Sequence, residues 1–347
     1  MKDHAYLRWM SENTPTKWCN DSAKMDELDA ALASGAVGCT SNPPLTYETL
    51  TATPALYGDG LEAIRAVPPG DERAVACISV VVRHIAARLA DIYESSRGEY
   101  GYIRAQVQPS LSGDADAMLK MGLLFASWAP NIKVKIPGTK AGIWVLEELA
   151  ARGIPTNPTV CVSVSQMTAA AEAHERGVAR ARAAGIAPAP STAAIVMGRL
   201  QDYLTTLNEE RGAGLPVSDL EWAALAVAKR CCRLYEERGY QQIVMPAAFR
   251  CAMQVSELAG ARAEMTIHPK IQDAVIEADA AGKLARGSNI GNAIDEDAVE
   301  RVRRALPAYT LAYEENALSP DEFDRYGATQ MTLRGFDVTG WQKLRTL

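Results

Sequence analysis

Two lysines in the stretch NIKVKIPGTKAG have the residue type and spacing for covalent chemistry on a carbonyl group. Lys133 and Lys135 alternate with Ile132, Val134 and Ile136. Side chains of an extended strand point to opposite faces in turn, so the two amines share one face and the apolar residues the other. Burial lowers the pKa of a lysine toward about 7–8, where the neutral amine is a nucleophile, and a like charge lowers it further. We expect Lys135, nearer the carboxyl end, to be the nucleophile and Lys133 to assist it; the alternative is that both amines pair with buried carboxylates.

Polar side chains also follow other apolar, β-prone segments, at the points where those segments end. They are Asp21, Asn42 with Thr40 and Ser41 before it, Gln106, Asn157 and Thr159. Taken singly, each suits a helix cap or a turn better than catalysis. Their shared position at successive strand ends favours a common site, because together above a lysine they would enclose a hydroxylated carbonyl compound.

The sequence contains no motif for a zinc site, a nucleotide-phosphate site or a serine nucleophile. The four histidines have neither H-x-x-x-H nor H-E-x-x-H spacing, so a zinc site is not predicted. There is no Walker loop for nucleotide phosphates and no G-x-S-x-G elbow for a serine nucleophile. We expect a reaction that uses no metal and no organic cofactor.

The composition of the chain narrows the setting in which it works. It has 347 residues, a net charge of −6 and a sequence pI near 5.4. An acidic chain without a polybasic run is a poor ligand for nucleic acid or for an anionic membrane. The start MKDHAYLRWMSEN lacks a signal-peptide layout, no apolar run has membrane-spanning length, and the seven cysteines are scattered. We expect a cytoplasmic protein with reduced cysteines.

Apolar, β-prone segments alternate with helical segments along most of the chain. Eight strands are expected, over residues 16–21, 36–42, 102–109, 132–138, 158–163, 192–199, 242–248 and 262–268. A strand followed by a helix eight times predicts an α/β fold, a (β/α)₈ TIM barrel, whose catalytic residues project from the carboxyl ends of the strands. An open doubly wound sheet is the alternative, since it shows the same alternation.

Helix signals complete this outline. Helices are expected over residues 22–35, 72–96, 139–153, 165–185, 218–239 and 256–260. Ser22 and Thr139 are the expected N-caps of the first and third helices, and Gly153 is expected to end the third. Short helical pieces alternate with turns near the C-terminus. We therefore expect a single barrel domain over residues 1–347, with 286–347 as a C-terminal helical extension packed on it.

Four segments together resemble a known family, the transaldolases, which are class I aldolases of the (β/α)₈ type related to fructose-6-phosphate aldolase. GAVGCTSNPPL is similar to the family's G-V-T-T-N-P-S-L segment, and VKIPGTKAGIWVLEELAARGI resembles its lysine segment. NPTVCVSVSQ is similar to N-x-T…F-S-x-x-Q, and AAFRCAMQVSELAGARAEMTIHP resembles S-F-R…E-L-A-G…T-I-x-P. The segments follow the family's order and spacing over most of residues 16–280.

The resemblance implies a catalytic role for four of the candidate residues. Lys135 would attack the ketone of a ketose phosphate and form a Schiff base, which serves as an electron sink. Asp21 would take the proton from the C4 hydroxyl as the C3–C4 bond breaks. Gln106 and Thr159 would position the water that relays protons at the imine carbon.

The same resemblance implies contacts with the substrate. The residues implied for the hydroxyls of the dihydroxyacetone unit are Asn42 and Asn157, with Thr40 and Ser41 beside Asn42. Arg199 and Arg250 would grip the substrate phosphate, because guanidinium groups bind phosphate oxygens through paired hydrogen bonds. Sugar phosphates are therefore the expected partners, and family precedent favours a homodimer.

Several residues depart from the family's pattern. Gln106 stands where most transaldolases have Glu, as it does in the fructose-6-phosphate aldolases, and an amide cannot ionise. Either Asn20 or Asp21 could fill the strand-one position; Asp21 is chosen because it begins a D-S pair like the family's D-T/S. Near the phosphate, two serines and an aromatic residue common in the family are replaced by Ala194, Val196 and Ala248.

The resemblance thus implies a transaldolase of the pentose phosphate pathway. Such an enzyme transfers a dihydroxyacetone unit from fructose 6-phosphate or sedoheptulose 7-phosphate to an aldose phosphate. One alternative is a lyase like fructose-6-phosphate aldolase, which releases dihydroxyacetone. The other is a catalytically silent barrel that only binds sugar phosphates, against which the intact Lys135 argues.

Overall fold

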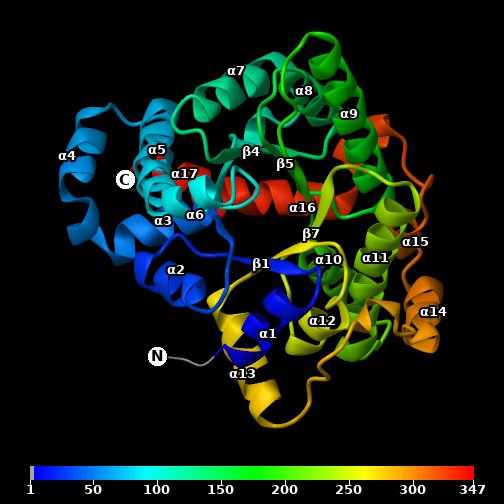
Figure 1. Cartoon of the computed structure of the whole chain (residues 1–347). Coiled ribbons are helices and arrows are strands. Elements are labelled where there is room, and N and C mark those ends of the chain that lie inside the picture. Colours follow the sequence, from blue (N-terminus) through cyan, green and yellow to red (C-terminus); the bar gives the residue numbers. More distant parts are fainter. Residues whose placement is uncertain (1–3) are drawn as a thin grey trace.

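Eight short parallel strands form the centre of the molecule within residues 4–347, the part that the computed structural model describes (Figure 1). Residues 1–3, which the expected domain includes, lie outside the described part. The strands are β1 (Lys17–Asn20), β2 (Gly38–Thr40), β3 (Tyr102–Gln106), β4 (Ile132–Pro137), β5 (Thr156–Thr159), β6 (Thr192–Ile195), β7 (Ile243–Pro246) and β8 (Glu264–Ile267).

The strands close into a barrel. Six of them pair in the order β5-β4-β3-β2-β1-β8, and β6 pairs with β7. Parallel bridges join the two sheets at both seams, between Thr156 and Ser191, Cys161 and Ile195, and Val244 and Ala263. Because these bridges join β5 to β6 and β7 to β8, the strands form a closed ring, so the open doubly wound sheet is excluded and the predicted (β/α)₈ barrel is confirmed.

Helices follow the strands and cover the outside of the barrel. Those that connect strands are α2 (Met25–Leu32), α3 (Pro43–Ala52), α4 (Gly58–Ala66), α5 (Asp71–Arg88), α6 (Ala90–Ser95), α7 (Ala115–Ala126), α8 (Lys140–Ala151), α9 (Val164–Ala183), α10 (Met197–Arg211), α11 (Val217–Glu237) and α12 (Ala252–Glu257). The helix α1 (Ala5–Asn13) precedes β1, α13 (Pro269–Ala280) follows β8, and the short turn η2 (Pro109–Leu111) follows β3.

Local signals set some of these ends and not others. Thr139 accepts a hydrogen bond from the Gly142 backbone N–H at 3.1 Å, so its predicted N-cap role is confirmed, and Gly153 has a φ of +67° just beyond the helix. Ser22 is not an N-cap, because α2 begins at Met25 and the Ser22 hydroxyl donates to Glu27 instead.

Two elements lie several residues before their expected positions. The fifth strand ends at Thr159 rather than at 163, because Val160 takes a φ of +59° and turns the chain. The helix expected over 256–260 is α12, which ends at Glu257. Ser256 is buried and accepts a hydrogen bond from the Tyr6 hydroxyl at 3.1 Å.

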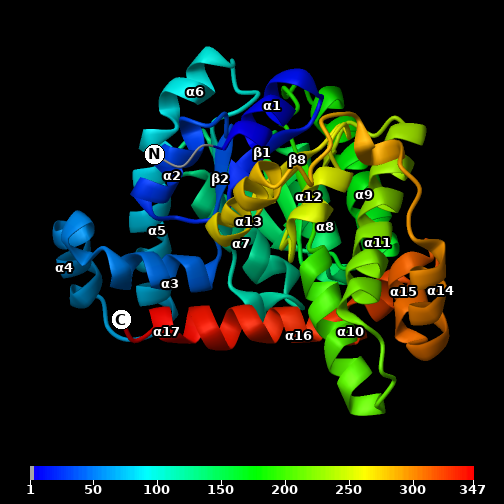
Figure 2. The same ribbon diagram turned by 90° about the horizontal axis from the view of Figure 1, so that it is seen from below.

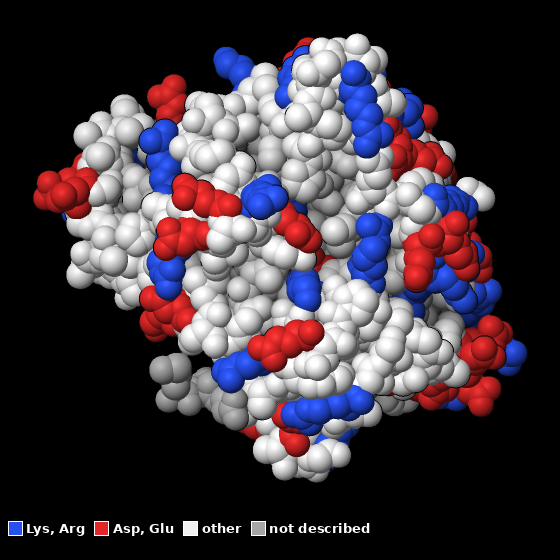
Figure 3. Space-filling view, viewed as in Figure 1, with Lys and Arg blue, Asp and Glu red and all other residues white. Residues whose placement is uncertain are grey.

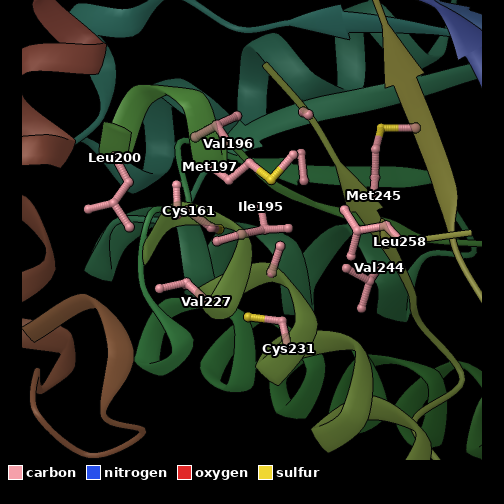
Figure 4. Close-up of a cluster of buried hydrophobic side chains, with 14 of the residues drawn as sticks. Cys161, Ile195, Val196, Met197, Leu200, Val227, Cys231, Val244, Met245 and Leu258 are labelled. Atoms are coloured by element: carbon pink, nitrogen blue, oxygen red, sulfur yellow. The ribbon is translucent and has the colours of Figure 1, made fainter. Parts of the chain in front are cut away.

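The apolar side chains of the strands pack outward against the helices. Val134 and Ile136 of β4 belong to one buried cluster with Phe125 of α7 and Leu149 of α8. A second cluster lies between β6, β7, α10 and α11, where Ile195 of β6 faces Val227 and Cys231 of α11 (Figure 4). The alternation predicted for β4 is therefore confirmed, since its apolar face meets helices and its two lysines point into the barrel.

The chain after α13 consists of short helices and turns. Its elements are η3 (Asn289–Gly291), α14 (Glu296–Ala305), α15 (Ala308–Tyr313), η4 (Pro320–Arg325), α16 (Gly327–Phe336), η5 (Asp337–Trp341) and α17 (Gln342–Leu344). α16 crosses the carboxyl-end face of the barrel, along the lower edge of Figure 2. Gln166 of α9 donates to the Thr329 hydroxyl at 3.3 Å, which ties α16 to the loop after β5.

Charged side chains of both signs are interspersed on the face of the molecule seen in Figure 3. No large area of a single sign is visible on that face, in keeping with the modest net charge of −6. Within residues 4–347, none of the helices combines the length and the apolar character needed to cross a membrane.

Candidate active site

Lys135 lies inside the barrel near the carboxyl end of β4. Gln106 of β3 and Asn157 of β5 pair with it in register, so the three side chains share the inward face. Only 6% of Lys135 is exposed, and its amine donates a hydrogen bond to the Ser41 backbone carbonyl at 3.2 Å. The structure therefore places the predicted nucleophile in a position that is almost fully shielded from solvent.

The electrostatic surroundings of this amine favour its neutral form. Burial lowers the pKa of Lys135 from its ordinary value to about 8. The Asp21 carboxylate opposes this shift, while the guanidinium groups of Arg104 and Arg199 add to it. The cations that assist are thus the two arginines, whereas Lys133 was the expected helper.

Three oxygen atoms near Lys135 have no hydrogen-bond partner within the described residues: Gln106 Oε1, Asn157 Oδ1 and Thr159 Oγ1. All three residues are buried. The Asn157 amide nitrogen, in contrast, donates to the backbone carbonyl and hydroxyl of Thr192, which fixes the side chain. An unpaired buried acceptor costs about 1–3 kcal/mol, so three together favour a site built to receive the donors of a ligand.

Asp21 is turned toward the mouth of the barrel and Asn20 is not. Asp21 follows β1, lines the cavity at the mouth, and accepts a hydrogen bond from the Thr40 hydroxyl at 2.6 Å. Asn20 is fully buried, donates to the Ser22 carbonyl at 2.9 Å and accepts from Gln272 at 2.9 Å. Of the two alternatives for the strand-one position, the geometry therefore favours Asp21.

The segment after β2 contributes differently at each position. The Ser41 hydroxyl donates to the Arg104 backbone carbonyl at 2.8 Å, so it is directed at β3 and not at the cavity. Asn42 lines the cavity, and its Oδ1 caps α3 by accepting the Leu45 backbone N–H at 2.9 Å. Of these two expected substrate contacts, the structure brings only Asn42 into reach.

A cavity of about 430 Å³ opens at the carboxyl ends of the strands. Its wall residues are Asp21, Asn42, Pro44, Leu45, Arg199, Ala248, Phe249, Arg250, His268, Lys270, Ile271 and Phe336. Lys135, Gln106, Asn157 and Thr159 are not on this wall; they lie deeper in the barrel. A substrate would therefore rest its polar head in the open cavity and reach the amine with its ketone end.

The two arginines predicted to bind phosphate lie side by side on this wall. Arg199 is in the first turn of α10, and Arg250 follows β7. Both contact Asp202, Arg250 through two hydrogen bonds and Arg199 at 3.5 Å. The structure thus brings together two cations that are far apart in the sequence.

Close backbone packing holds these two segments together. A Cβ atom on Gly198 would lie 1.7 Å from the Ala248 carbonyl oxygen, so only glycine permits this approach. Ala248 itself has a φ of +60°, and Val160, beside Thr159, has a φ of +59°. Such conformations cost about 1–3 kcal/mol each and gather at functional sites.

Lys133 lies one layer deeper, on the floor of the barrel. Its amine is 3.8 Å from Glu264 Oε2 and 4.7 Å from the centre of the Tyr102 ring. Arg104 forms an ion pair with the same carboxylate. Burial opposes ionisation of Glu264, but Arg104 and Lys133 outweigh it and hold its pKa at about 2. For Lys133, the alternative of pairing with a buried carboxylate therefore holds.

Among the cavity-wall residues that sequence reasoning did not single out are His268, Lys270 and Phe336. His268 and Lys270 follow β8, where the T-I-x-P resemblance leaves the third position undefined. The Lys270 backbone N–H donates to His268 Nδ1 at 3.2 Å, so a neutral ring carries its proton on Nε2. Phe336 comes from α16, and no local signal in the sequence links it to the strands.

These features define a closed (β/α)₈ barrel with a lysine-centred site at the carboxyl ends of its strands. A sequence model of the transaldolase/fructose-6-phosphate aldolase family matches residues 18–318, and the chain belongs to that family.

Relatives with assigned names agree with this family. The chain is 31% identical to a transaldolase of Neisseria meningitidis serogroup A over 217 residues, which are 61% of this chain and 59% of the relative. It is 29% identical to a transaldolase of Thiobacillus denitrificans over 63% of this chain and 64% of the relative. A protein named transaldolase 1 from Streptomyces avermitilis is 28% identical over 67% of this chain and 64% of the relative. The chain thus spans about three fifths of the length of these relatives.

Proposed function

We propose that this chain is a transaldolase that transfers a dihydroxyacetone unit from a ketose phosphate to an aldose phosphate through a Schiff base on Lys135. The observation that carries the proposal is a buried amine, with its pKa lowered to about 8, beside three acceptor oxygens that have no hydrogen-bond partner among the described residues. A lysine that only bound an anion would gain nothing from burial, because burial disfavours the charged form.

The reaction begins when the neutral Lys135 amine adds to the C2 carbonyl of the donor. Loss of water gives a protonated imine, which withdraws electrons from the C3–C4 bond. Asp21 takes the proton of the C4 hydroxyl as that bond breaks, and the shortened aldose leaves. The bound enamine then adds to the aldehyde carbon of an acceptor, and hydrolysis of the new imine releases the product ketose and the free amine.

The unpartnered oxygens have matching tasks in this scheme. Asn157 Oδ1 would accept a hydroxyl of the dihydroxyacetone unit, because the Asn157 nitrogen is already engaged. Gln106 Oε1 and Thr159 Oγ1 would hold the water that leaves and returns at the imine carbon. Thr40 would act through Asp21, because its hydroxyl donates a hydrogen bond to the Asp21 carboxylate. Ser41 would contribute only its backbone carbonyl, which accepts a hydrogen bond from the Lys135 amine.

The phosphate of the donor would bind at the opening of the cavity. Arg199 and Arg250 stand on its wall, and Lys270 adds a third cation there. Alanine at 248 supplies no hydroxyl to such a phosphate, so the clamp would depend on its cations.

A lyase reaction is the second candidate, and Gln106 favours it. An amide at this position cannot ionise, so proton relay at the imine carbon differs from that of a carboxylate. If the enamine is protonated at carbon before an acceptor arrives, it becomes an imine, and water hydrolyses that imine to dihydroxyacetone and the free Lys135 amine. The third reading, a barrel that binds sugar phosphates without turnover, requires that Lys135 form no imine.

Borohydride trapping tests the proposal directly. With fructose 6-phosphate present, reduction should leave a dihydroxyacetone adduct on Lys135, measured by peptide mass spectrometry. No adduct would overturn the Schiff-base mechanism and leave the silent binder. Turnover should then depend on erythrose 4-phosphate as acceptor; an equal rate without acceptor would favour the lyase.

The proposal also covers the pathway, the cellular compartment, the domain organisation and the assembly of the chain. The pentose phosphate pathway and the cytoplasm are its expected setting, with one barrel domain over residues 1–347 and 286–347 as its C-terminal extension. A homodimer is the expected assembly. Sedimentation equilibrium of the full chain would measure that assembly, and a monomer at all concentrations would contradict it.

A further inference from the structure

Asp202 is a carboxylate of α10 that touches both candidate phosphate ligands. It follows Arg199 by one helical turn, and its Oδ2 is 3.5 Å from the Arg199 guanidinium. Its two oxygens accept hydrogen bonds from Arg250 Nε at 2.9 Å and Arg250 Nη2 at 2.5 Å. This is the planar fork in which a carboxylate fixes both the place and the plane of a guanidinium.

Arg250 is almost fully engaged before any ligand binds. Its Nη1 donates to the Ala248 carbonyl at 2.8 Å and to the Phe249 carbonyl at 3.2 Å. A guanidinium has five N–H donors. With the two on Asp202, four are occupied within the described residues, and one on Nη2 remains. The Arg250 guanidinium is therefore held in one orientation, and it can offer a phosphate one N–H donor, on Nη2.

Arg199 is held much more loosely. The only polar contact of its side chain among residues 4–347 is the long one to Asp202, and its guanidinium lies 5.6 Å from the centre of the Phe336 ring. Its side chain is 41% exposed. It therefore keeps most of its donors and can adjust to the anion that arrives. The two arginines of the clamp are not equivalent.

We propose that Asp202 is a positioning residue, which locks Arg250 in the orientation that binds the substrate phosphate and leaves Arg199 as the adjustable partner. This inference rests on the proposed function and deepens its phosphate clamp. The competing view is that Asp202 only offsets one of two adjacent positive charges. The two views predict opposite signs for the loss of its charge.

The sign follows from which effect is larger. Asp202 is 31% exposed, so solvent and salt screen its repulsion of a nearby phosphate. Its fork with Arg250, in contrast, determines whether a charge-assisted hydrogen bond to the phosphate forms at all. In Asp202→Asn one oxygen becomes an NH₂ group that faces a guanidinium N–H, and the guanidinium must turn away. We therefore expect weaker phosphate binding, although the site becomes more positive.

The test compares Asp202→Asn and Asp202→Glu with the unaltered full chain. Inorganic phosphate is titrated by isothermal calorimetry, and KM is measured for fructose 6-phosphate and for unphosphorylated fructose. Asp202→Asn should weaken phosphate binding and raise KM for fructose 6-phosphate about tenfold, while kcat/KM for fructose stays within about twofold. Asp202→Glu should restore part of the loss, since it keeps the carboxylate.

A matched control separates this role from the general effect of breaking a fork. Asp279 of α13 accepts two hydrogen bonds from Arg286, both at 2.8 Å, outside the cavity wall. Asp279→Asn should leave phosphate binding and both substrates unchanged. Unchanged or tighter phosphate binding in Asp202→Asn, or equal losses in the two Asn variants, would overturn the positioning role. If the chain shows no aldol activity at all, the calorimetric comparison still decides the role of Asp202, because it requires no turnover.

Discussion

The floor and the mouth of the barrel each hold a buried lysine of strand β4, and the two amines have different hydrogen-bond and ion-pair partners. On the floor, Lys133 shares Glu264 with Arg104, and its amine faces the Tyr102 ring. At the mouth, the Lys135 amine donates to the Ser41 backbone carbonyl, and oxygens without a hydrogen-bond partner among residues 4–347 lie nearby. Both amines have a pKa lowered from the ordinary value to about 8, for which burial is the largest cause.

The comparison shows that a low pKa alone does not mark a nucleophile. Both lysines pass that criterion, but only one has room above it and acceptors without donors beside it. On the floor, the acceptor Glu264 is already shared by two cations and the Cys19 thiol. Chemistry is therefore expected where the barrel leaves hydrogen bonds unmade, and stability where it completes them.

Exchanging each lysine for methionine should break this comparison most clearly. Lys135→Met should remove the borohydride-trapped adduct and reduce activity by about 10⁴-fold or more, as expected when a nucleophile is deleted. Lys133→Met should retain the adduct, because that amine lies below the reacting carbon. Mass spectrometry of the trapped peptide and a coupled assay measure both. Loss of the adduct in Lys133→Met would contradict the assignment of Lys135 as the nucleophile.

Two threonines allow the mouth and the floor to be compared through a single hydroxyl. Thr159→Val removes an unpartnered hydroxyl, so kcat should fall about 10²-fold while thermal stability stays the same or rises. Thr16→Val removes a hydroxyl that donates to the Ala261 carbonyl and accepts from the Gly260 N–H. That change should lower the free energy of unfolding by about 1–3 kcal/mol and spare kcat. Denaturant unfolding and steady-state kinetics measure the pair; the reverse pattern would contradict the division.

The pH dependence of imine formation should sharpen the picture of the mouth. The amine attacks only when neutral, and its pKa of about 8 lies below that of an ordinary lysine. The rate of trapping should therefore rise about tenfold per pH unit up to pH 8 and level off above it. Stopped reactions between pH 6 and 10 measure this profile. A midpoint of the pH profile near the pKa of a free lysine would show that burial does not lower the pKa of Lys135.

The smallest expected effect comes from the aromatic side chain that covers the mouth. Phe336→Ala removes the ring under Arg199 and should raise KM for fructose 6-phosphate about two- to fivefold with little change in kcat. Tyr313→Leu removes a comparable ring under Arg230, outside the cavity wall, and should leave KM unchanged. Initial-rate kinetics distinguish the two; equal changes would indicate a general effect of lost packing.

Much of the barrel could be predicted because its signals are local. Alternation in β4 identified the inward lysines, and all eight strands lie at or near their expected segments. The errors arose where tertiary contacts override local preference. Val160 looks β-prone but turns the chain with a positive φ, and Ser22 was expected to cap α2 but lies before its start and donates to Glu27.

The site divides in the same way. Lys135, Gln106 and Asn157 were accessible from the sequence because strand register places them together. Asp202 and Phe336 were not, because their roles depend on α10 meeting the loop after β7 and on α16 crossing the mouth. Ser41 shows the converse, since its hydroxyl is consumed by a backbone bond that the sequence does not reveal.

The path of α16 has a consequence for how the protein is made. Phe336 belongs to a segment synthesised after all eight strands, and the cavity wall is incomplete without it. All eight strands of the barrel are therefore translated before the last residue of the cavity wall. The complete cavity wall requires the translation of α16, which begins at Gly327, 60 residues after the end of β8 at Ile267.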